Sequence, residues 1–262
     1  MSLDRLLYYI YSTENEVSHL IDIHCHMLPG VDDGSGSMET SLLMAQDAVR
    51  GGTDVIIVTP HCNIPGAQPN YQSAELLRQF FALRAAIDNA GIPLKILAGA
   101  EIFCTEDTPE LFKEKKLLTL ASSCYMLVEF SFDESIINID RKLTRLAALG
   151  IKPVIAHPER YEAVHRNPQL CIDWFELGYV LQINKDSVFG LLGRHAQKCS
   201  KWMLAHGLAH AAASDAHGTV SRTADLSAFR EYVEAEHSAD YAQILLYENP
   251  RRIIKGLPMV RP

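Results

Sequence analysis

The feature of this 262-residue chain that most constrains its fold is a regular alternation of short apolar runs and amphipathic helical patterns. Seven apolar runs predict buried strands, at residues 20–24, 54–58, 94–98, 126–130, 153–156, 179–183 and 210–214. Helical periodicity predicts helices between them, at 38–50, 71–90, 139–149, 168–177 and 195–205, and a helical tail over 225–254. Strands that alternate with helices are typical of parallel βα units. We therefore predict an α/β protein.

Polar side chains at the carboxyl ends of the predicted strands favour one arrangement of the sheet. These residues are His24, His26, His61, Glu101, Glu129, His157, Asn184, Asp215 and His217. Seven parallel strands could close into a barrel or lie side by side in an open, doubly wound sheet. In a barrel the strand ends converge on one face, where active sites are found, whereas an open sheet would spread them along an edge. The pattern therefore favours the barrel.

Length and composition predict one domain. A single α/β barrel takes about 250 residues, so we expect residues 20–262 to form it and residues 1–19 to precede it as an extension. The extension has a short apolar stretch followed by acidic residues and no small-residue cleavage site, so we expect no signal peptide. No apolar run has the length of a membrane span. The net charge of −8 and the lack of a Lys/Arg-rich run argue against a nucleic-acid partner.

A histidine pair follows the first predicted strand. His24 and His26 are two residues apart, so on a strand they project to the same side and can hold one metal ion. An isolated H-x-H is more often a pair of ordinary histidines, and the interpretation depends on what accompanies it. Asp32-Asp33-Gly34 comes shortly afterwards. It predicts a tight turn that can also supply a carboxylate ligand, from Asp33 in preference to Asp32.

The remaining strand ends contribute the same residue types, namely His61, Glu101, Glu129, His157, Asp215 and His217. Glu129 is the strongest local anomaly, because it lies in an apolar strand, and a buried lone carboxylate is costly unless it is paired or binds a metal. Together the candidates are numerous enough for more than one divalent ion, with carboxylates able to bridge. Imidazole mixed with carboxylate suits Mn, Fe or Zn rather than Ca.

The order of these motifs resembles a known superfamily. H-x-H, D-D-G, T-P-H, G-A-E-I, E-F, H-P-E-R and S-D-A-H follow one another between Leu20 and Arg222, as in the polymerase-and-histidinol-phosphatase (PHP) superfamily. Within it, the chain is most similar to the manganese-dependent tyrosine-protein phosphatases of bacterial capsule and exopolysaccharide operons. The stretches 31–34, 157–160 and 181–184 favour that branch. The resemblance implies a distorted seven-stranded (β/α) barrel that holds two to three ions, Mn²⁺ in the first place and Fe or Zn as alternatives.

The resemblance also implies roles for individual residues. The metal ligands would be His24, His26, Asp33, His61, Glu101, Glu129, His157, Asp215 and His217. Glu101 is similar to the carboxylate that bridges ions, and Arg160 and Arg222 are similar to the arginines that hold the phosphate. Cys62 departs from the pattern, since relatives often have a second histidine there, but the implied ligand set does not include this position.

The activity that the resemblance implies is hydrolysis of phosphotyrosine on a protein, with a bacterial tyrosine autokinase that regulates polysaccharide synthesis as the partner. Metal ions would neutralise the phosphate and lower the pKa of a water, which attacks in line as hydroxide. Arg160 would clamp the phosphate oxygens. Alternatives are a small-molecule phosphatase such as a histidinol-phosphatase, a nuclease-type PHP domain, and a metal-binding module without catalysis. The pattern specifies no oligomeric state.

Other phosphatase chemistries fail on the sequence. The six cysteines are scattered without a C-x-x-C pair, which predicts free thiols in a reducing cytoplasm. A cysteine-dependent tyrosine phosphatase needs an arginine six positions after its cysteine. Those positions hold Val31, Gln68, Glu110, Phe130, Leu177 and Ala205. The chain also has no P-loop and no G-x-S-x-G nucleophile elbow.

Overall fold

The protein is described here by a computed structural model that covers residues 19–262; the predicted extension therefore lies outside the described residues except for its last residue. The strands are β1 (Leu20–Cys25), β2 (Thr53–Val58), β3 (His61–Cys62), β4 (Lys95–Ala98), β5 (Glu101–Phe103), β6 (Tyr125–Glu129), β7 (Lys152–Ala156), β8 (Val180–Asn184) and β9 (Ala211–Ala213). They form one sheet in the order β1-β2-β4 and another in the order β3-β5-β6-β7-β8-β9. All pairs within the sheets are parallel, which confirms the α/β class.

The predicted count of seven strands is wrong, because the second and third predicted strands each have a separate continuation, β3 and β5. The interruption falls at Pro60, which has no N–H to donate to a ladder. Hydrogen bonds nevertheless cross it: the amide of Gly99 donates to the carbonyl of Val58, and the amide of Glu101 donates to that of Pro60. The register therefore continues from β2–β4 into β3–β5, and His61 lies beside Glu101.

The two sheets do not join into one closed sheet within residues 19–262. β1 and β9 approach each other at an isolated parallel bridge between Cys25 and Ala216. The amide of His26 donates to the carbonyl of Ala216, and the amide of Asp215 donates to that of His24. This contact lies at the carboxyl ends of both strands, so the residues that follow β1 and β9 are neighbours.

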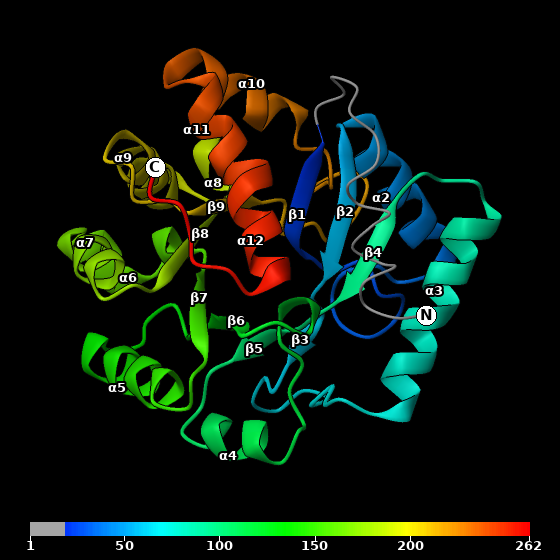
Figure 1. The fold of residues 1–262 in the computed structure, drawn as a ribbon, viewed down its shortest axis with the longest axis horizontal. Coiled ribbons are helices and arrows are strands. Elements are labelled where there is room, and N and C mark those ends of the chain that lie inside the picture. The colour runs from blue at the N-terminus through cyan, green and yellow to red at the C-terminus, as the bar shows by residue number, and fades with distance from the viewer. Residues whose placement is uncertain (1–18) are drawn as a thin grey trace.

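Helices lie around the outside of the strands (Figure 1). They are α2 (Met38–Arg50), α3 (Ala74–Asn89), α4 (Thr108–Lys113), α5 (Ile136–Ala147), α6 (Glu162–Arg166), α7 (Gln169–Glu176), α8 (Lys185–Val188), α9 (Arg194–Ala205), α10 (Ser227–Glu236), α11 (Ala239–Gln243) and α12 (Asn249–Lys255). Short helical turns occupy η1 (Leu120–Ser122), η2 (Pro158–Arg160) and η3 (Ile244–Glu248). Serine side chains cap α2, α3 and α5, which explains where these helices begin. The predicted helical tail is divided into α10, α11, η3 and α12.

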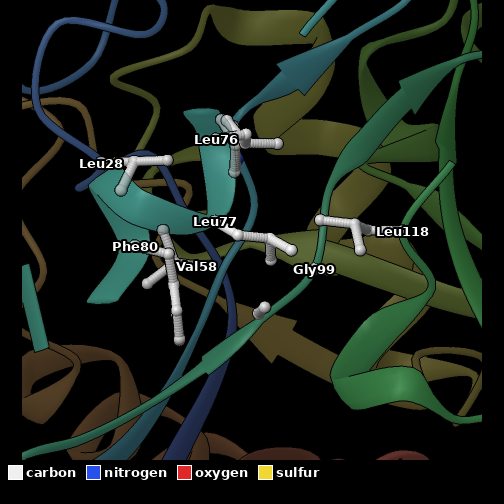
Figure 2. Close-up of a pocket in the computed structure, with 9 residues that line it drawn as sticks. Leu28, Val58, Leu76, Leu77, Phe80, Gly99 and Leu118 are labelled. Atoms are coloured by element: carbon white, nitrogen blue, oxygen red, sulfur yellow. The ribbon is translucent and has the colours of Figure 1, made fainter. Parts of the chain in front are cut away.

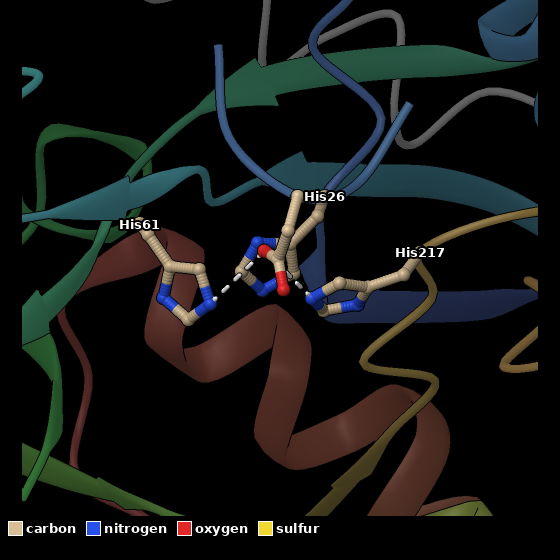
Figure 3. Close-up of side chains that lie close together, drawn as sticks. His26, His61 and His217 are labelled. Carbon is tan, nitrogen blue, oxygen red and sulfur yellow. Dashed lines mark ion pairs between the residues drawn. The ribbon is translucent and has the colours of Figure 1, made fainter. Parts of the chain in front are cut away.

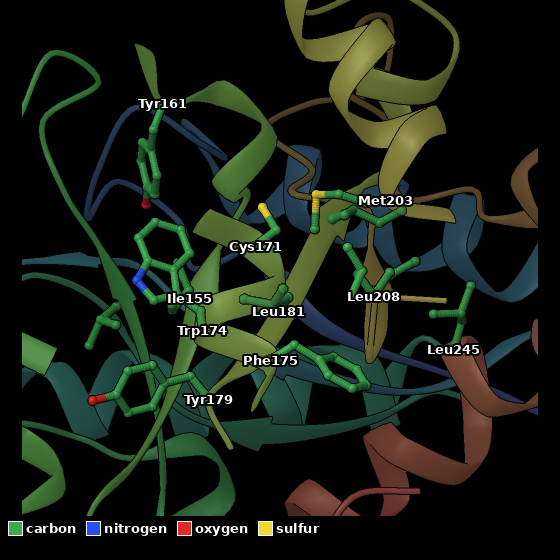
Figure 4. Close-up of a cluster of buried hydrophobic side chains, with 14 of the residues drawn as sticks. Ile155, Tyr161, Cys171, Trp174, Phe175, Tyr179, Leu181, Met203, Leu208 and Leu245 are labelled. Carbon is green, nitrogen blue, oxygen red and sulfur yellow. The ribbon is translucent and has the colours of Figure 1, made fainter. Parts of the chain in front are cut away.

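The strands are buried on both faces, as expected for parallel sheets. Ile155 of β7 and Leu181 of β8 pack outward with Trp174 of α7 and Met203 of α9 (Figure 4). The alternate strand residues form a separate cluster between the strands, which we term the inner cluster. It comprises Ile21, Ile23, Ile57, Tyr125, Leu127, Val154, Ala156, Val180, Ala211 and Ala213, with Leu120 and Ile253.

A third cluster packs α2 and α3 against β2 and β4. It contains a small crevice of about 10 Å³ beside Leu76, Phe80 and Leu118 (Figure 2). That is about the space of one water molecule, and the lining is apolar, so the crevice belongs to the packing of the core.

Two other sequence predictions are tested by the structure. All six cysteines are free thiols, as predicted. Among residues 19–262, no helix combines the length and the apolarity that crossing a membrane requires.

Candidate metal centre

The residues predicted as metal ligands converge at the carboxyl ends of the strands. They come from the end of β1 and the loop after it, from β3, β5 and β6, and from the segments after β7 and β9: His24, His26, Asp33, His61, Glu101, Glu129, His157, Asp215 and His217. Three sets of their side chains place one ligand atom each within 4.8 Å of the others, close enough to hold an ion.

A bulge in β1 turns both of its histidines into the site. Between Asp22 and Cys25, β1 has three residue steps where its partner β2 has two, and an extra residue of this kind bends a strand and re-aims its side chains. His24 and His26 therefore face each other, with their Nε2 atoms 3.1 Å apart.

The central group consists of His24, His26, Glu101 and Asp215, all four of them buried. Each histidine Nε2 lies 3.2 Å from Oε2 of Glu101 and 3.4 Å from Oδ1 of Asp215. Ligand atoms that surround one ion tetrahedrally at about 2.0–2.2 Å are about 3.3–3.6 Å apart. The group therefore has nearly the spacing of a metal site.

Two further groups adjoin the central one. His61 Nδ1 lies 3.0 Å from Oε2 of Glu101 and 3.0 Å from Oε1 of Glu129. On its other side, His61 Nε2 is 3.5 Å from Oδ1 of Asp33, which is also 3.5 Å from His217 Nε2 (Figure 3). Glu101 takes part in two of the groups through one oxygen, and its other oxygen lies 2.9 Å from Nε2 of His157. This carboxylate has the position that a bridging ligand needs.

Buried polar atoms without a hydrogen-bond partner gather in these groups. Among the described residues they include Nδ1 of His61, Oε2 of Glu101 and Nε2 of His217. Unpaired buried polar atoms are costly, so each needs an explanation. A cation held among them would supply the missing partner, and the residues present therefore fit a metal.

The charges of the central group support one another. Burial raises the pKa of Glu101, but the charge of His24 and hydrogen bonds from His157 hold that pKa well below its ordinary value. Burial likewise raises the pKa of Asp215, and the charge of His24 and the hydrogen bond from His26 outweigh it. Both carboxylates thus stay ionised only because positive charge is close to them, and a divalent cation can provide that charge.

The structure gives the two neighbouring aspartates, Asp32 and Asp33, different contacts. Asp32 Oδ2 lies 2.8 Å from His26 Nδ1 and accepts the backbone amide of His61 at 2.8 Å, so it orients His26 from behind. Asp33 instead faces His61 and the candidate site, although its side chain is 69% exposed. Gly34 is required in this turn, because a Cβ there would lie 2.1 Å from the carbonyl oxygen of His26.

A cavity of about 350 Å³ opens over the ligand groups. Its lining includes two cationic side chains, Arg160 and Arg222. Arg222 Nη2 lies 2.6 Å and Arg160 Nη1 lies 3.6 Å from Oδ2 of Asp215. The lining also includes four apolar side chains, Ile64, Phe103, Phe130 and Phe132. Arg160 also lies over the ring of Phe132, with Cζ 4.4 Å from the ring centroid, so the cationic and the aromatic parts of the lining meet in a cation–π contact.

Sequence reasoning assigned no role to Phe132 or Gln182. Phe132 follows the predicted fourth strand and remains 42% exposed at the cavity. Gln182 and Asn184 lie in β8 and are fully buried. Two amides that alternate with apolar residues in a buried strand are themselves a signal of an inward polar surface, and this signal was present in the sequence.

The fold and these groups define an α/β protein with a candidate multinuclear metal centre at the carboxyl ends of its parallel strands. Residues 20–255 match the family described as "Capsular polysaccharide synthesis, CpsB/CapC", and the chain belongs to that family.

Its relatives cover almost the whole chain. Tyrosine-protein phosphatase YwqE of Bacillus subtilis (strain 168) is 33% identical over 242 residues, which is 92% of this chain and 94% of YwqE. Tyrosine-protein phosphatase CpsB of Streptococcus pneumoniae is also 33% identical over 242 residues, 90% of this chain and 98% of CpsB. A crystal structure from work on these two proteins, described as unique metal-dependent tyrosine phosphatases, superimposes with a TM-score of 0.86 at 32% identity and covers 93% of this chain and 97% of its own.

A more distant similarity concerns the fold alone. The phosphotriesterase homology protein from Escherichia coli, solved with phosphate in its active site, has a TM-score of 0.59 at 12% identity, and the match covers 91% of this chain and 99% of that one.

Proposed function

We propose that this chain is a metal-dependent protein-tyrosine phosphatase. The observation that carries the proposal is the composition of the cavity over the ligand groups, which joins clustered histidines and carboxylates, two arginines and several aromatic rings. These are the three features that an aryl phosphate needs. The names of the relatives YwqE and CpsB support the same activity.

We propose as ligands the nine residues His24, His26, Asp33, His61, Glu101, Glu129, His157, Asp215 and His217, with Glu101 bridging. Imidazole and carboxylate together suit Mn²⁺, with Fe or Zn as alternatives, and the three groups have room for two to three ions. When bound, such ions neutralise phosphate oxygens and lower the pKa of a water enough to form hydroxide at neutral pH.

The arginines and the aromatic side chains have separate tasks in this proposal. Arg160 and Arg222 bind the non-bridging phosphate oxygens and stabilise the charge that develops on them. Phe132 holds the guanidinium of Arg160 in place from the cavity side and presents its ring to the aromatic ring of the substrate. The cavity opens to the surface, so a tyrosine on a flexible peptide can enter.

The partner and the setting are part of the proposal, which the family description, capsular polysaccharide synthesis, supports. We propose that the substrate is a phosphotyrosine protein, a bacterial tyrosine autokinase that regulates capsular or exopolysaccharide synthesis, and that the reaction takes place in the cytoplasm. We further propose that residues 20–262 form one domain whose two sheets enclose the inner cluster as a distorted barrel. Support for this is that the cluster draws on β1, β2 and β6 to β9 and that β1 and β9 meet at Cys25 and Ala216.

The test compares a phosphotyrosine peptide with histidinol phosphate as substrates. Each is assayed after chelation, again with Mn²⁺ restored, and with the variants His157→Ala and Arg160→Ala. We expect Mn²⁺-dependent hydrolysis of the peptide, lost in both variants. Arg166→Ala is the matched control, because Arg166 is exposed and its ion pair with Glu162 lies away from the cavity.

The other outcomes are equally decisive. A preference for histidinol phosphate would reject the tyrosine phosphatase in favour of a small-molecule phosphatase with the same site. Metal binding without hydrolysis of either substrate would point to a binding module.

A further inference from the structure

Two buried amides on β8 stand between candidate ligands that come from different strands. Gln182 and Asn184 are two residues apart and project to the same side, and both are fully buried. Their neighbours across the ladder in β9 are Ala211 and Ala213. Because these neighbours are only methyl groups, the amides reach past β9 to residues at the ends of β1 and β9.

The amides form a continuous hydrogen-bond network. Asn184 Nδ2 donates to Oδ2 of Asp215 at 2.6 Å, and Gln182 Nε2 donates to Oδ1 of Asn184 at 2.9 Å. Gln182 Oε1 lies 3.0 Å from Nδ1 of His24. This network therefore connects two members of the central group, Asp215 and His24.

The donor and the acceptor of each hydrogen bond in this network are determined by Asp215. An ionised carboxylate can only accept hydrogen bonds, so Asn184 must turn its NH₂ group to Asp215. Its oxygen then faces Gln182, which must donate to it, and this leaves the Gln182 oxygen for His24. His24 consequently donates from Nδ1 and directs the lone pair of Nε2 to the central group, which is the orientation that a metal ligand requires.

The same strand end is anchored on its backbone. The amide of Asn184 donates to Oε1 of Glu159 at 2.9 Å, and Glu159 lies fully buried in η2, next to Arg160. The backbone of Asn184 is therefore tied to the turn that carries Arg160.

We propose that Gln182 and Asn184 are positioning residues that couple His24 to Asp215 and hold both ligands ready for one shared ion. The proposal rests on the ligand set of the proposed function. A purely structural role predicts that loss of the amide lowers the stability of the metal-free protein alone. A positioning role predicts that the affinity for the metal falls while the protein is still folded.

The experiment titrates Mn²⁺ into the chelator-treated full chain and follows free Mn²⁺ by electron paramagnetic resonance, without substrate. Gln182→Met keeps the length of the side chain but removes the acceptor for His24, so we expect the tightest Mn²⁺ site to weaken about 10- to 100-fold. Gln182→Glu keeps an acceptor for His24 but loses the donor to Asn184, so we expect it to recover only part of the affinity. Gln197→Met is the control, because the side-chain amide of Gln197 donates to the carbonyl of Val188, outside the site.

Wild-type affinity in Gln182→Met would overturn the proposal, and so would a loss in Gln182→Glu as large as that in Gln182→Met. Circular dichroism establishes that each variant is folded at the temperature of the titration. If Gln182→Met does not fold, Gln182→Glu decides alone: because it cannot donate to Asn184, a several-fold loss of affinity supports the coupling and wild-type affinity rejects it. Failure of the phosphatase assay would leave these results unaffected, because no substrate is involved.

Discussion

The space between the strands has two halves with opposite chemistry. The inner cluster fills it along the strands, as far as Ala156 and Ala213, and histidines, carboxylates and amides fill it at and beyond the carboxyl ends. The same strands supply both: Val180 of β8 is followed on the same face by Gln182, and Leu127 of β6 is followed by Glu129. Position along the strand alone separates packing from chemistry.

The difference shows how the polar half is tolerated. Buried charges cost free energy unless they are paired, and removal of one partner is strongly destabilising. In the polar half each carboxylate has imidazole or guanidinium neighbours, such as those that surround Asp215. The apolar half supplies burial energy and holds the strand ends at fixed separations. Changes in the two halves should therefore have different consequences, which can be measured.

The largest effect is expected in the polar half, from Glu101→Gln. Loss of the charge shared by two ligand groups should lower kcat/KM for a phosphotyrosine peptide at least about 1,000-fold, or about 4 kcal/mol. The amount of Mn²⁺ bound per chain should fall as well, which elemental analysis measures. Glu75→Gln, an exposed glutamate on α3, is the control. Full activity with unchanged metal content in Glu101→Gln would refute the bridging role.

In the apolar half, Ile57→Ala should act on stability instead. Ile57 is fully buried in the inner cluster, and truncation of such a side chain costs about 2–5 kcal/mol of unfolding free energy. Urea unfolding followed by circular dichroism measures this loss, and the folded fraction should retain its kcat. Leu177→Ala, 67% exposed, should change stability by less than about 0.5 kcal/mol. A drop in kcat per folded molecule as large as the one expected for Glu101→Gln would contradict the separation of the halves.

A third test uses a histidine that lies outside the polar half. His210 is buried, stacks on Phe175 and accepts the amide of Leu181. Burial, aided by the charge of Arg261, lowers its pKa from 6.5 to about 4. Protonation therefore favours the unfolded chain. Its contribution to stability is complete above about pH 6.5 and declines as the pH falls towards 4, by about 3 kcal/mol in total.

His210→Gln in chelator-treated protein should remove this part of the pH dependence, measured as urea unfolding free energies between pH 7 and 4. His206→Gln, at an exposed position on the end of α9, should keep the wild-type slope. The same slope in all three proteins would show that His210 does not titrate in this way.

The smallest effect is expected at the boundary of the cavity, from Phe132→Leu. Loss of the aromatic face should reduce the preference for an aryl over an alkyl phosphate about threefold to tenfold, corresponding to a contact of about 0.5–1.5 kcal/mol. Any disturbance of Arg160 affects both substrates equally, so the ratio of their kcat/KM values isolates the ring contact. Phe189→Leu is a close control, since Phe189 is 41% exposed and Phe132 is 42% exposed. An unchanged ratio would exclude stacking by Phe132.

Much of the fold could be predicted because the strands are short, largely apolar runs, most of which have a glycine or proline near one end. The prediction for 20–24 and β1 differ by one residue, and the predicted helix 38–50 coincides with α2. β3 and β5 were missed because each is too short to show periodicity. The bulge in β1 depends on the register with a neighbouring strand, and no local pattern encodes that neighbour.

The candidate site was predictable in its residues more than in its geometry. Histidines and carboxylates at strand ends are conspicuous in the sequence, since apolar runs precede them. The sequence does not decide between Asp32 and Asp33 as the ligand, because the two residues have the same side chain and lie in the same turn. The direction of each side chain depends on contacts with distant segments, such as the amide of His61 that engages Asp32.

The sequence by itself determined the parallel α/β class, the residue types of the site and their order along the chain, because short-range periodicity and side-chain chemistry are local properties. The tertiary structure decided which atoms meet. It divided the strands into two sheets, placed Glu101 between His24, His61 and His157, and joined His24 to Asp215 through two amides of β8. These relations link residues far apart in the chain, and only the packed strands bring them within hydrogen-bonding distance.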